Sequence, residues 1–159
     1  MPKATLCDNP SVSLYERLER ELTDARRRRD ELGLSTLSLL KSEVVRATKE
    51  PGAGAADDAL VVRVAQRELK RREEAATAFR GGGRMASAEK EEQEAELIRA
   101  YLPAALTDQE LEQELRAVIA EVKPEGPQGF GQVMKAATAR LAGRAEGGRI
   151  AATVKRLLA

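Results

Sequence analysis

The feature that most constrains this chain is a helical period that runs through nearly its whole length. Apolar residues recur three or four positions apart, as at Leu14, Leu18 and Leu22, and no segment alternates apolar and polar residues as a half-buried strand would. Alanine is the commonest residue and only 3% of residues are aromatic, a composition suited to close helix packing. We therefore predict an all-α protein.

Glycine and proline clusters divide this pattern into seven predicted helices. Gly33 is expected to end the first helix, which Ser11 or Ser13 caps, and Ser35 or Thr36 is expected to cap the second. The other five are expected over about 57–79, 86–101, 107–122, 129–141 and 147–158. The core positions expected in the third helix are Val61, Ala65, Leu69, Ala76 and Phe79.

The clearest helix start lies at Thr107. Thr107 and Glu110 have the spacing of a capping box, and Leu106 and Leu111 occupy the two positions of a hydrophobic staple. We predict three parts: a disordered lead-in over 1–11, an N-terminal helical bundle over 12–103, and a small three-helix tail domain over 104–159.

The composition excludes the commonest catalytic machinery. Without histidine, the chain has no Ser/His/Asp or Cys/His nucleophile system and no imidazole general base, and its single cysteine excludes a four-thiolate metal site. The glycines at 81–83 lack the spacing of a phosphate loop. We therefore predict no catalytic residue, no metal site and no cofactor.

The formal net charge of +1 conceals a basic segment at the C-terminal end. Residues 104–125 carry a net charge of −4, whereas residues 126–159 carry +5. Six cations in that segment are candidates for contacts with a nucleic-acid backbone: Lys135, Arg140, Arg144, Arg149, Lys155 and Arg156.

The loop over 143–147 lies among these cations. Gly143 permits a left-handed helix exit, and Gly147 leaves room for a phosphate at the free N–H groups of the next helix. The alternative is that the glycines only make a turn and the arginines are ordinary solvated side chains. A contiguous positive face would favour RNA binding, and pairing with Glu112, Glu114 or Glu121 would favour the alternative.

Two other features have simpler interpretations. The Arg26 to Arg29 run is expected to be a solvated, salt-bridged helix face because Asp24, Asp30 and Glu31 surround it. The aromatic residues are expected to pack against helices rather than stack on bases: Tyr15, Phe79, Tyr101 and Phe130.

Several motifs occur together in a fixed order. They are Leu37-x-x-Leu40-Lys41, Arg67-Glu68-Leu69-x-x-Arg72, Gly82-Gly83-Arg84, Tyr101-Leu102-Pro103, Gly131-x-Val133-Met134 and Gly143-Arg144-Ala145-Glu146-Gly147. This set resembles the GatB/YqeY domain family, in particular its stand-alone YqeY-like members, over about residues 13–159. The chain departs from the family pattern at Gly129, Glu146 and Met85, and the first two changes are expected to weaken helix caps.

The resemblance implies a helical N-terminal region and a tail similar to the end of the B subunit of the glutamine-dependent tRNA amidotransferase. With this resemblance we predict a non-catalytic adaptor whose partners are tRNA or a protein of the tRNA-charging machinery. The lack of a long apolar run or of an apolar N-terminal signal predicts a cytoplasmic protein with no membrane partner. Within the tail, Gly131, Val133, Met134, Gly143 and Gly147 are expected to be structural motif residues. Two alternatives remain: a protein-interaction module without RNA binding, and part of a glutamine-dependent carbon–nitrogen ligase.

Overall fold

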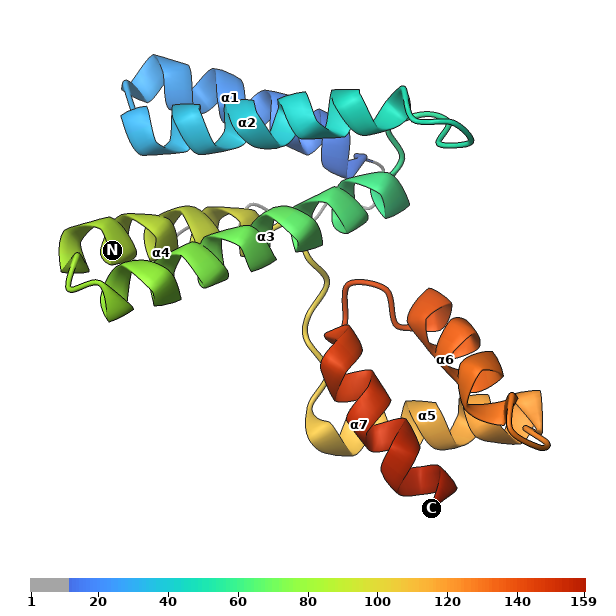
Figure 1. The fold of residues 1–159 in the computed structure, drawn as a ribbon. Helices are drawn as coiled ribbons and strands as arrows, with labels where there is room; N and C mark the ends of the chain where they lie inside the picture. The colour runs from blue at the N-terminus through green and yellow to red at the C-terminus, as the bar shows by residue number, and fades with distance from the viewer. Residues whose placement is uncertain (1–11) are drawn as a thin grey trace. The chain divides into compact units, whose positions relative to one another are not determined.

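The computed structural model describes residues 12–159, which form seven α-helices and no strands (Figure 1). The predicted all-helical fold is thus confirmed for these residues. The predicted lead-in over 1–11, which includes Ser11, lies outside the described residues. The chain divides into two compact units between Tyr101 and Leu102. We call them the N-terminal unit and the tail unit and describe each by itself.

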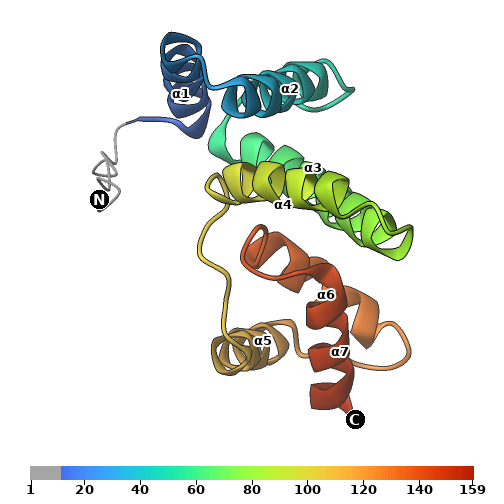
Figure 2. The ribbon, with the colours of Figure 1, turned by 90° about the vertical axis from the view of Figure 1, so that its left-hand side faces the viewer.

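The N-terminal unit consists of two helical hairpins. Its helices are α1 (Leu14–Arg28), α2 (Glu31–Thr48), α3 (Asp58–Gly81) and α4 (Met85–Arg99). Helix α2 packs against α1, α3 and α4, and α3 packs along α4, as the ribbon in Figure 2 also shows. The largest aliphatic side chains that are fully buried in this unit are Leu18, Leu40, Val44, Val61, Val64 and Ile98.

The first turn lies earlier than the sequence pattern indicates. Helix α1 ends at Arg28, Arg29 takes the left-handed conformation with φ 56°, and the Asp30 carboxylate accepts a hydrogen bond from the Gly33 N–H at 2.9 Å. The predictions that Gly33 ends the first helix and that Ser35 or Thr36 caps the second are therefore wrong, because α2 begins at Glu31 with Asp30 as its N-cap. Gly33 is a buried residue of α2, where a Cβ atom would collide with the Asp30 carboxylate. The glycine thus makes room for the cap of the following helix.

The first helix begins as one of the sequence alternatives predicts. Ser13 forms a capping box with Glu16, each side chain bonding the other's backbone N–H. The turn at 81–83 is confirmed as well, with Gly83 at φ 73° between α3 and α4.

A buried ionic network lies between α3 and α4. Leu69 and Phe79, both predicted core residues, are only partly buried, whereas Glu68 is buried at 1% exposure. The Glu68 carboxylate lies 2.9 Å from Arg71 and 3.7 Å from Arg72, and Arg72 lies 3.0 Å from Glu94 of α4. A carboxylate tolerates this burial only because arginines compensate its charge.

The N-terminal unit ends on a buried tyrosine. Tyr101 donates its hydroxyl hydrogen to the Glu21 carboxylate, and the Arg17 guanidinium lies 4.8 Å from the centre of its ring. Arg17 also donates to the Ala100 carbonyl at 3.1 Å. Burial, together with the hydrogen bond to Glu21, raises the pKa of Tyr101, so its hydroxyl stays protonated over the physiological range.

The tail unit is a three-helix assembly built from α5 (Asp108–Val122), α6 (Gly129–Arg140) and α7 (Gly147–Leu158). The predicted capping box is confirmed: Thr107 accepts from the Glu110 N–H, and Glu110 accepts from the Thr107 N–H. The hydrophobic core of this unit is formed by the buried residues Leu106, Leu111, Leu115, Val118, Val133, Ala137, Leu141, Ile150 and Val154.

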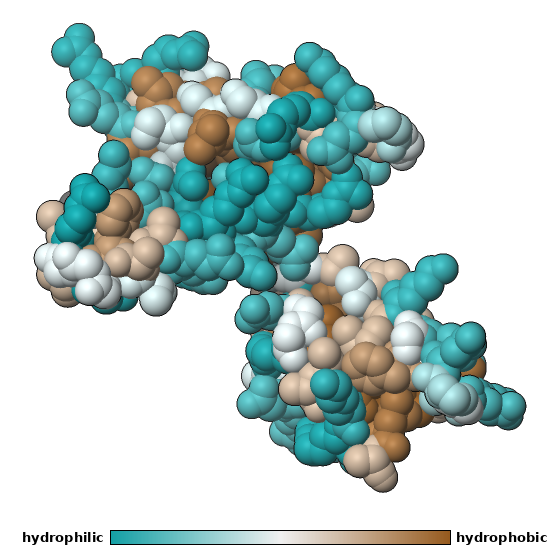
Figure 3. All heavy atoms as spheres, in the orientation of Figure 1, coloured by the Kyte–Doolittle hydropathy of each residue, from teal (hydrophilic) through white to brown (hydrophobic). Residues whose placement is uncertain are grey.

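The face of the N-terminal unit that Figure 3 shows is largely polar. In the view of Figure 3, hydrophilic residues cover much of the N-terminal unit, with smaller apolar areas between them. Four large hydrophobic side chains are exposed: Leu39, Val45, Met85 and Leu158. Within residues 12–159, no helix combines the length and apolar character that a membrane span requires.

Candidate nucleic-acid interface

The six candidate cations are distributed over three consecutive segments of the tail unit. Lys135 and Arg140 lie on α6, Arg144 lies in the loop that follows, and the other three lie on α7. All six are at least partly exposed. The structure separates them into four arginines that pair with acidic side chains and two lysines that do not.

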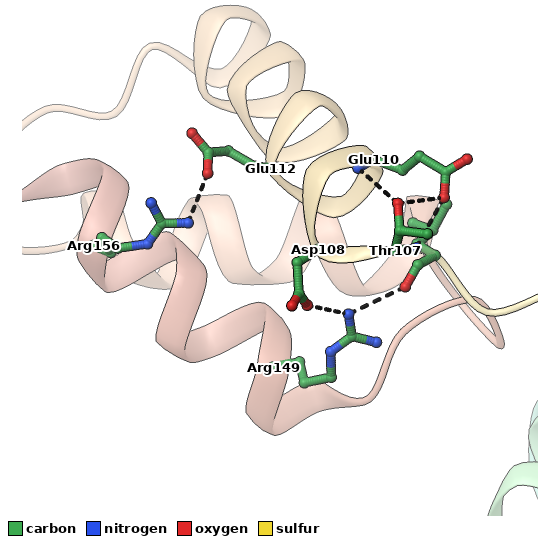
Figure 4. Close-up of polar contacts among 7 residues, drawn as sticks. Thr107, Asp108, Glu110, Glu112, Arg149 and Arg156 are labelled. Atoms are coloured by element: carbon green, nitrogen blue, oxygen red, sulfur yellow. Dashed lines mark hydrogen bonds and ion pairs between the residues drawn. The ribbon is translucent and has the colours of Figure 1, made fainter.

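On α7, two arginines pair with acidic residues of α5 (Figure 4). Arg149 lies 2.6 Å from Asp108 and also donates to the Leu106 carbonyl at 3.1 Å. Arg156 donates to Glu112 at 2.8 Å. Asp108 has no local sequence signal for this role, because 41 positions separate it from Arg149.

On α6 and in the following loop, two more arginines pair with α5. Arg140 donates to Glu121 at 2.9 Å and to Glu114 at 3.1 Å. Arg144 lies 3.9 Å from Glu114, and its carbonyl accepts a hydrogen bond from the Leu106 N–H at 2.8 Å. Pairing with glutamates of α5 is what the sequence analysis expects if the arginines are ordinary surface side chains rather than an RNA-binding face.

Two of the paired side chains, Glu112 and Arg140, have shifted pKa values. Hydrogen bonds from Arg156 and Arg116 hold the pKa of Glu112 below its usual value, and the hydrogen bond to Glu121 raises the pKa of Arg140. The Thr107 backbone and hydroxyl likewise lower the pKa of Glu110. The lowered pKa values favour the ionised form of both Glu110 and Glu112.

The two lysines differ from the arginines. Lys135 and Lys155 are exposed, and neither has an ion pair with any other described residue. The Lys155 ammonium lies 6.0 Å from the centre of the Phe130 ring, at the limit of a cation–π contact. These two charges remain available to an external anion.

The start of α7 carries no side-chain cap. Its N-cap residue, Glu146, has the usual extended conformation but makes no side-chain hydrogen bond to the helix, and Gln128 at the start of α6 makes none either. Neither helix thus has a side-chain cap, and at α6 the cap position is Gln128, with Gly129 as the first helical residue. Gly143 has φ 80°, as the predicted left-handed exit requires, and the space where Cβ atoms of Gly147 and Gly148 would lie is open.

The remaining motif residues of the tail differ in what their surroundings require of them. Val133 is fully buried and Met134 packs against the same core. Gly131 has open space where a Cβ would lie, so its small size is not required by a neighbouring group. Buried Gly129 does need to be glycine, because a Cβ there would lie 2.8 Å from the Pro124 side chain.

The arginine run of α1 is less paired than predicted. Of its four members only Arg27 has an ion pair, with Asp24 at 3.8 Å, and the other three have none with the described residues. All four are exposed. The prediction of a salt-bridged face is therefore wrong for three of them, since Asp30 is engaged at the start of α2 instead.

The aromatic residues are partly or fully buried among the described helices, each with a cation over its ring.

No group of three or more His, Cys, Asp or Glu side chains within residues 12–159 is arranged to hold a metal ion.

The sequence was compared with models of known protein families. The model of the YqeY-like proteins matches residues 15–158, which is nearly the whole chain and includes both units. The chain belongs to the YqeY-like family. It is thus a member in which the family model extends over the acidic helix α5 as well as the cations of α6 and α7. No curated protein matches the sequence significantly.

Proposed function

We propose that this YqeY-like protein is a non-catalytic adaptor whose tail unit binds the phosphate backbone of tRNA. The observation that carries the proposal is the start of α7, where uncapped N–H groups, open space above two glycines and a neighbouring arginine occur together. Through its family relationship we connect this activity to tRNA-dependent amidation.

The start of α7 has the physical properties of an anion site. The first N–H groups of a helix have no partner within the helix, and the helix dipole gives this end a partial positive charge. Phosphate groups bind such ends when backbone can approach closely, which Gly147 and Gly148 allow. Arg149 is the third residue of the helix, and a phosphate bound there would compete with Asp108 for its guanidinium.

The cations further along α6 and α7 would hold adjacent phosphates. Lys135 and Lys155 are exposed and uncompensated, and each would contribute through counterion release rather than by reading bases. Exposed ion pairs stabilise a protein by only about 0 to 1 kcal/mol each. A phosphate can therefore replace the carboxylate partner of an exposed arginine such as Arg156.

A second candidate function is a protein-interaction module that binds no RNA. The pairing of four candidate arginines with α5 favours it, because the net charge of residues 102–159 is only +1. On this view the arginines attach α5 to α6 and α7, and the tail has no surplus charge for a polyanion.

A tRNA titration with the full chain distinguishes the two functions. Binding is measured over a salt series for the wild type, for Lys135→Gln/Lys155→Gln, and for the control Arg26→Gln/Arg28→Gln. The control removes the same charge from exposed, unpaired cations of the N-terminal unit. We expect the lysine variant to weaken binding and to reduce the salt slope by about 0.7 to 0.9 for each lost phosphate contact.

Two results would contradict the proposal. One is an affinity of the wild type for tRNA no tighter than for a bulk anionic polymer such as heparin. The other is an equal loss in the two variants, which would mean that total charge or the arginine run of α1 holds the RNA. Recovery of a stable protein partner after nuclease treatment, with no RNA, would establish the second candidate.

A further inference from the structure

Four carboxylates of α5 lie along both edges of its buried stripe. Leu111, Leu115 and Val118 form the stripe that faces the tail core. On a helix, positions 108 and 112 lie along one edge of this stripe, and positions 114 and 121 along the other. The acidic residues at these positions are Asp108, Glu112, Glu114 and Glu121.

Each edge faces different cations. The Asp108 and Glu112 edge contacts Arg149 and Arg156 of α7, at 2.6 and 2.8 Å. The other edge contacts α6 and the loop after it, where Glu114 and Glu121 pair with Arg140 at 3.1 and 2.9 Å. Four of the six candidate cations are therefore occupied from within the unit.

These carboxylates offer the arginines the same chemistry as a phosphate. Both groups present negatively charged oxygens that accept hydrogen bonds from the planar guanidinium fork, so one arginine cannot satisfy both fully. The side chains of the four arginines are between 38% and 62% exposed, so solvent reaches them. An incoming polyanion can thus compete for them.

We propose that the carboxylate row of α5 is an internal competitor that reduces the affinity of the tail unit for phosphate polymers. This inference rests on the proposed function, because it concerns the same cations. The carboxylate row determines how many of the six candidate cations a bound RNA can contact. The two lysines have no acidic partner, whereas each arginine becomes available only when a phosphate displaces its carboxylate. Weakly charged or single anions would then fail to displace the row, and dense polyanions would succeed.

One substitution and a matched control test this competition. Glu112→Gln removes the partner of Arg156, whereas Glu125→Gln makes the same charge change in the tail unit at a residue with no ion pair among the described residues. We measure the affinity of the full-length proteins for tRNA over a salt series. In parallel, we measure their affinity for inorganic polyphosphate, a probe without bases or fold.

The expected result is tighter binding by Glu112→Gln alone. Release of one or two arginines should strengthen tRNA binding about 2- to 5-fold, the range that an exposed ion pair accounts for. The salt slope should steepen by about 0.7 to 0.9 for each arginine released. The same order of variants is expected with polyphosphate, and Glu125→Gln should change binding less than Glu112→Gln with both probes.

The outcomes separate this inference from the proposed function. If the wild type binds tRNA specifically and the two variants behave alike, the competitor is overturned and the proposed function stands. If Glu112→Gln alone gains affinity for polyphosphate while no form binds tRNA specifically, the competitor stands and the proposed function fails. A gain in neither probe, with reduced stability of Glu112→Gln, would mean that the pairs only fasten the helices and would overturn the inference.

Discussion

Replacement of Glu146 by aspartate should stabilise the tail unit. Residue 146 already has the extended conformation of an N-cap, with φ −73° and ψ 142°, but its side chain makes no hydrogen bond to α7. The chain shows what an aspartate does in this position: Asp57 accepts from the N–H three residues on at 2.8 Å, and Asp30 does so at 2.9 Å. We expect Glu146→Asp to accept from the Arg149 N–H in the same way.

The size of the effect follows from the cap. A good N-cap is worth about 0.5 to 2 kcal/mol, and about 1 kcal/mol shifts the melting temperature of a domain of this size by about 4 to 8 °C. Because the new carboxylate would occupy the N–H groups proposed for a phosphate, tRNA binding should weaken about 5-fold per kcal/mol. Stability and binding are thus expected to change in opposite directions.

Thermal unfolding followed by circular dichroism, and a tRNA titration, measure the two effects on the same samples. Glu146→Gln is the matched control, because it removes the charge and supplies no short cap. An unchanged melting temperature in Glu146→Asp would refute the reasoning that these N–H groups are free. A higher melting temperature with unchanged tRNA affinity would refute their use by phosphate.

Three further predictions concern stability. Arg72→Met should destabilise the N-terminal unit by about 3 to 5 kcal/mol in urea unfolding, because buried Glu68 and the Glu94 carboxylate both lose this arginine. A loss below about 1 kcal/mol would mean that Arg72 does not compensate the buried charge. Leu115→Ala, at a fully buried position, should cost the tail unit about 2 to 5 kcal/mol by the same measurement, and a neutral result would mean that α5 is not anchored there. Because the pKa of Glu112 is lowered from 4.5, the stability from its ion pairs should be complete above pH 4.5 and lost as the pH falls through the lowered value. The difference in urea midpoint between the wild type and Glu112→Gln should therefore shrink between pH 7 and pH 3, and a constant difference would contradict the assignment.

Local sequence signals predict the helices well and the first turn poorly. The capping box at Thr107 and the glycine turn at 81–83 depend on neighbouring residues alone, so spacing is enough to find them. Gly33 is different, because a glycine after a helical stripe usually marks a helix end. The Asp30 cap and the left-handed Arg29 place the turn three residues earlier, and a non-glycine residue with positive φ has no strong sequence signal.

The charges of the candidate site show a different limit. Counting by segment finds the acidic helix and the basic end of the chain, but it cannot say which charges meet. The pairs Arg140–Glu114 and Arg156–Glu112 join residues 26 and 44 positions apart, so only the packing of the three helices determines them. The same limit applies on α3. Helical spacing alone predicts that Leu69 is buried, whereas the structure buries its neighbour Glu68 and leaves Leu69 partly exposed.

The most direct test of the account is to map where tRNA contacts the protein. Backbone amide resonances of the isotope-labelled full-length chain are followed during a titration with tRNA. The account predicts the largest shifts at Gly147, Gly148 and Arg149, with smaller shifts near Lys135 and Lys155. Shifts confined to residues of the N-terminal unit, or the absence of shifts at saturating tRNA, would contradict it.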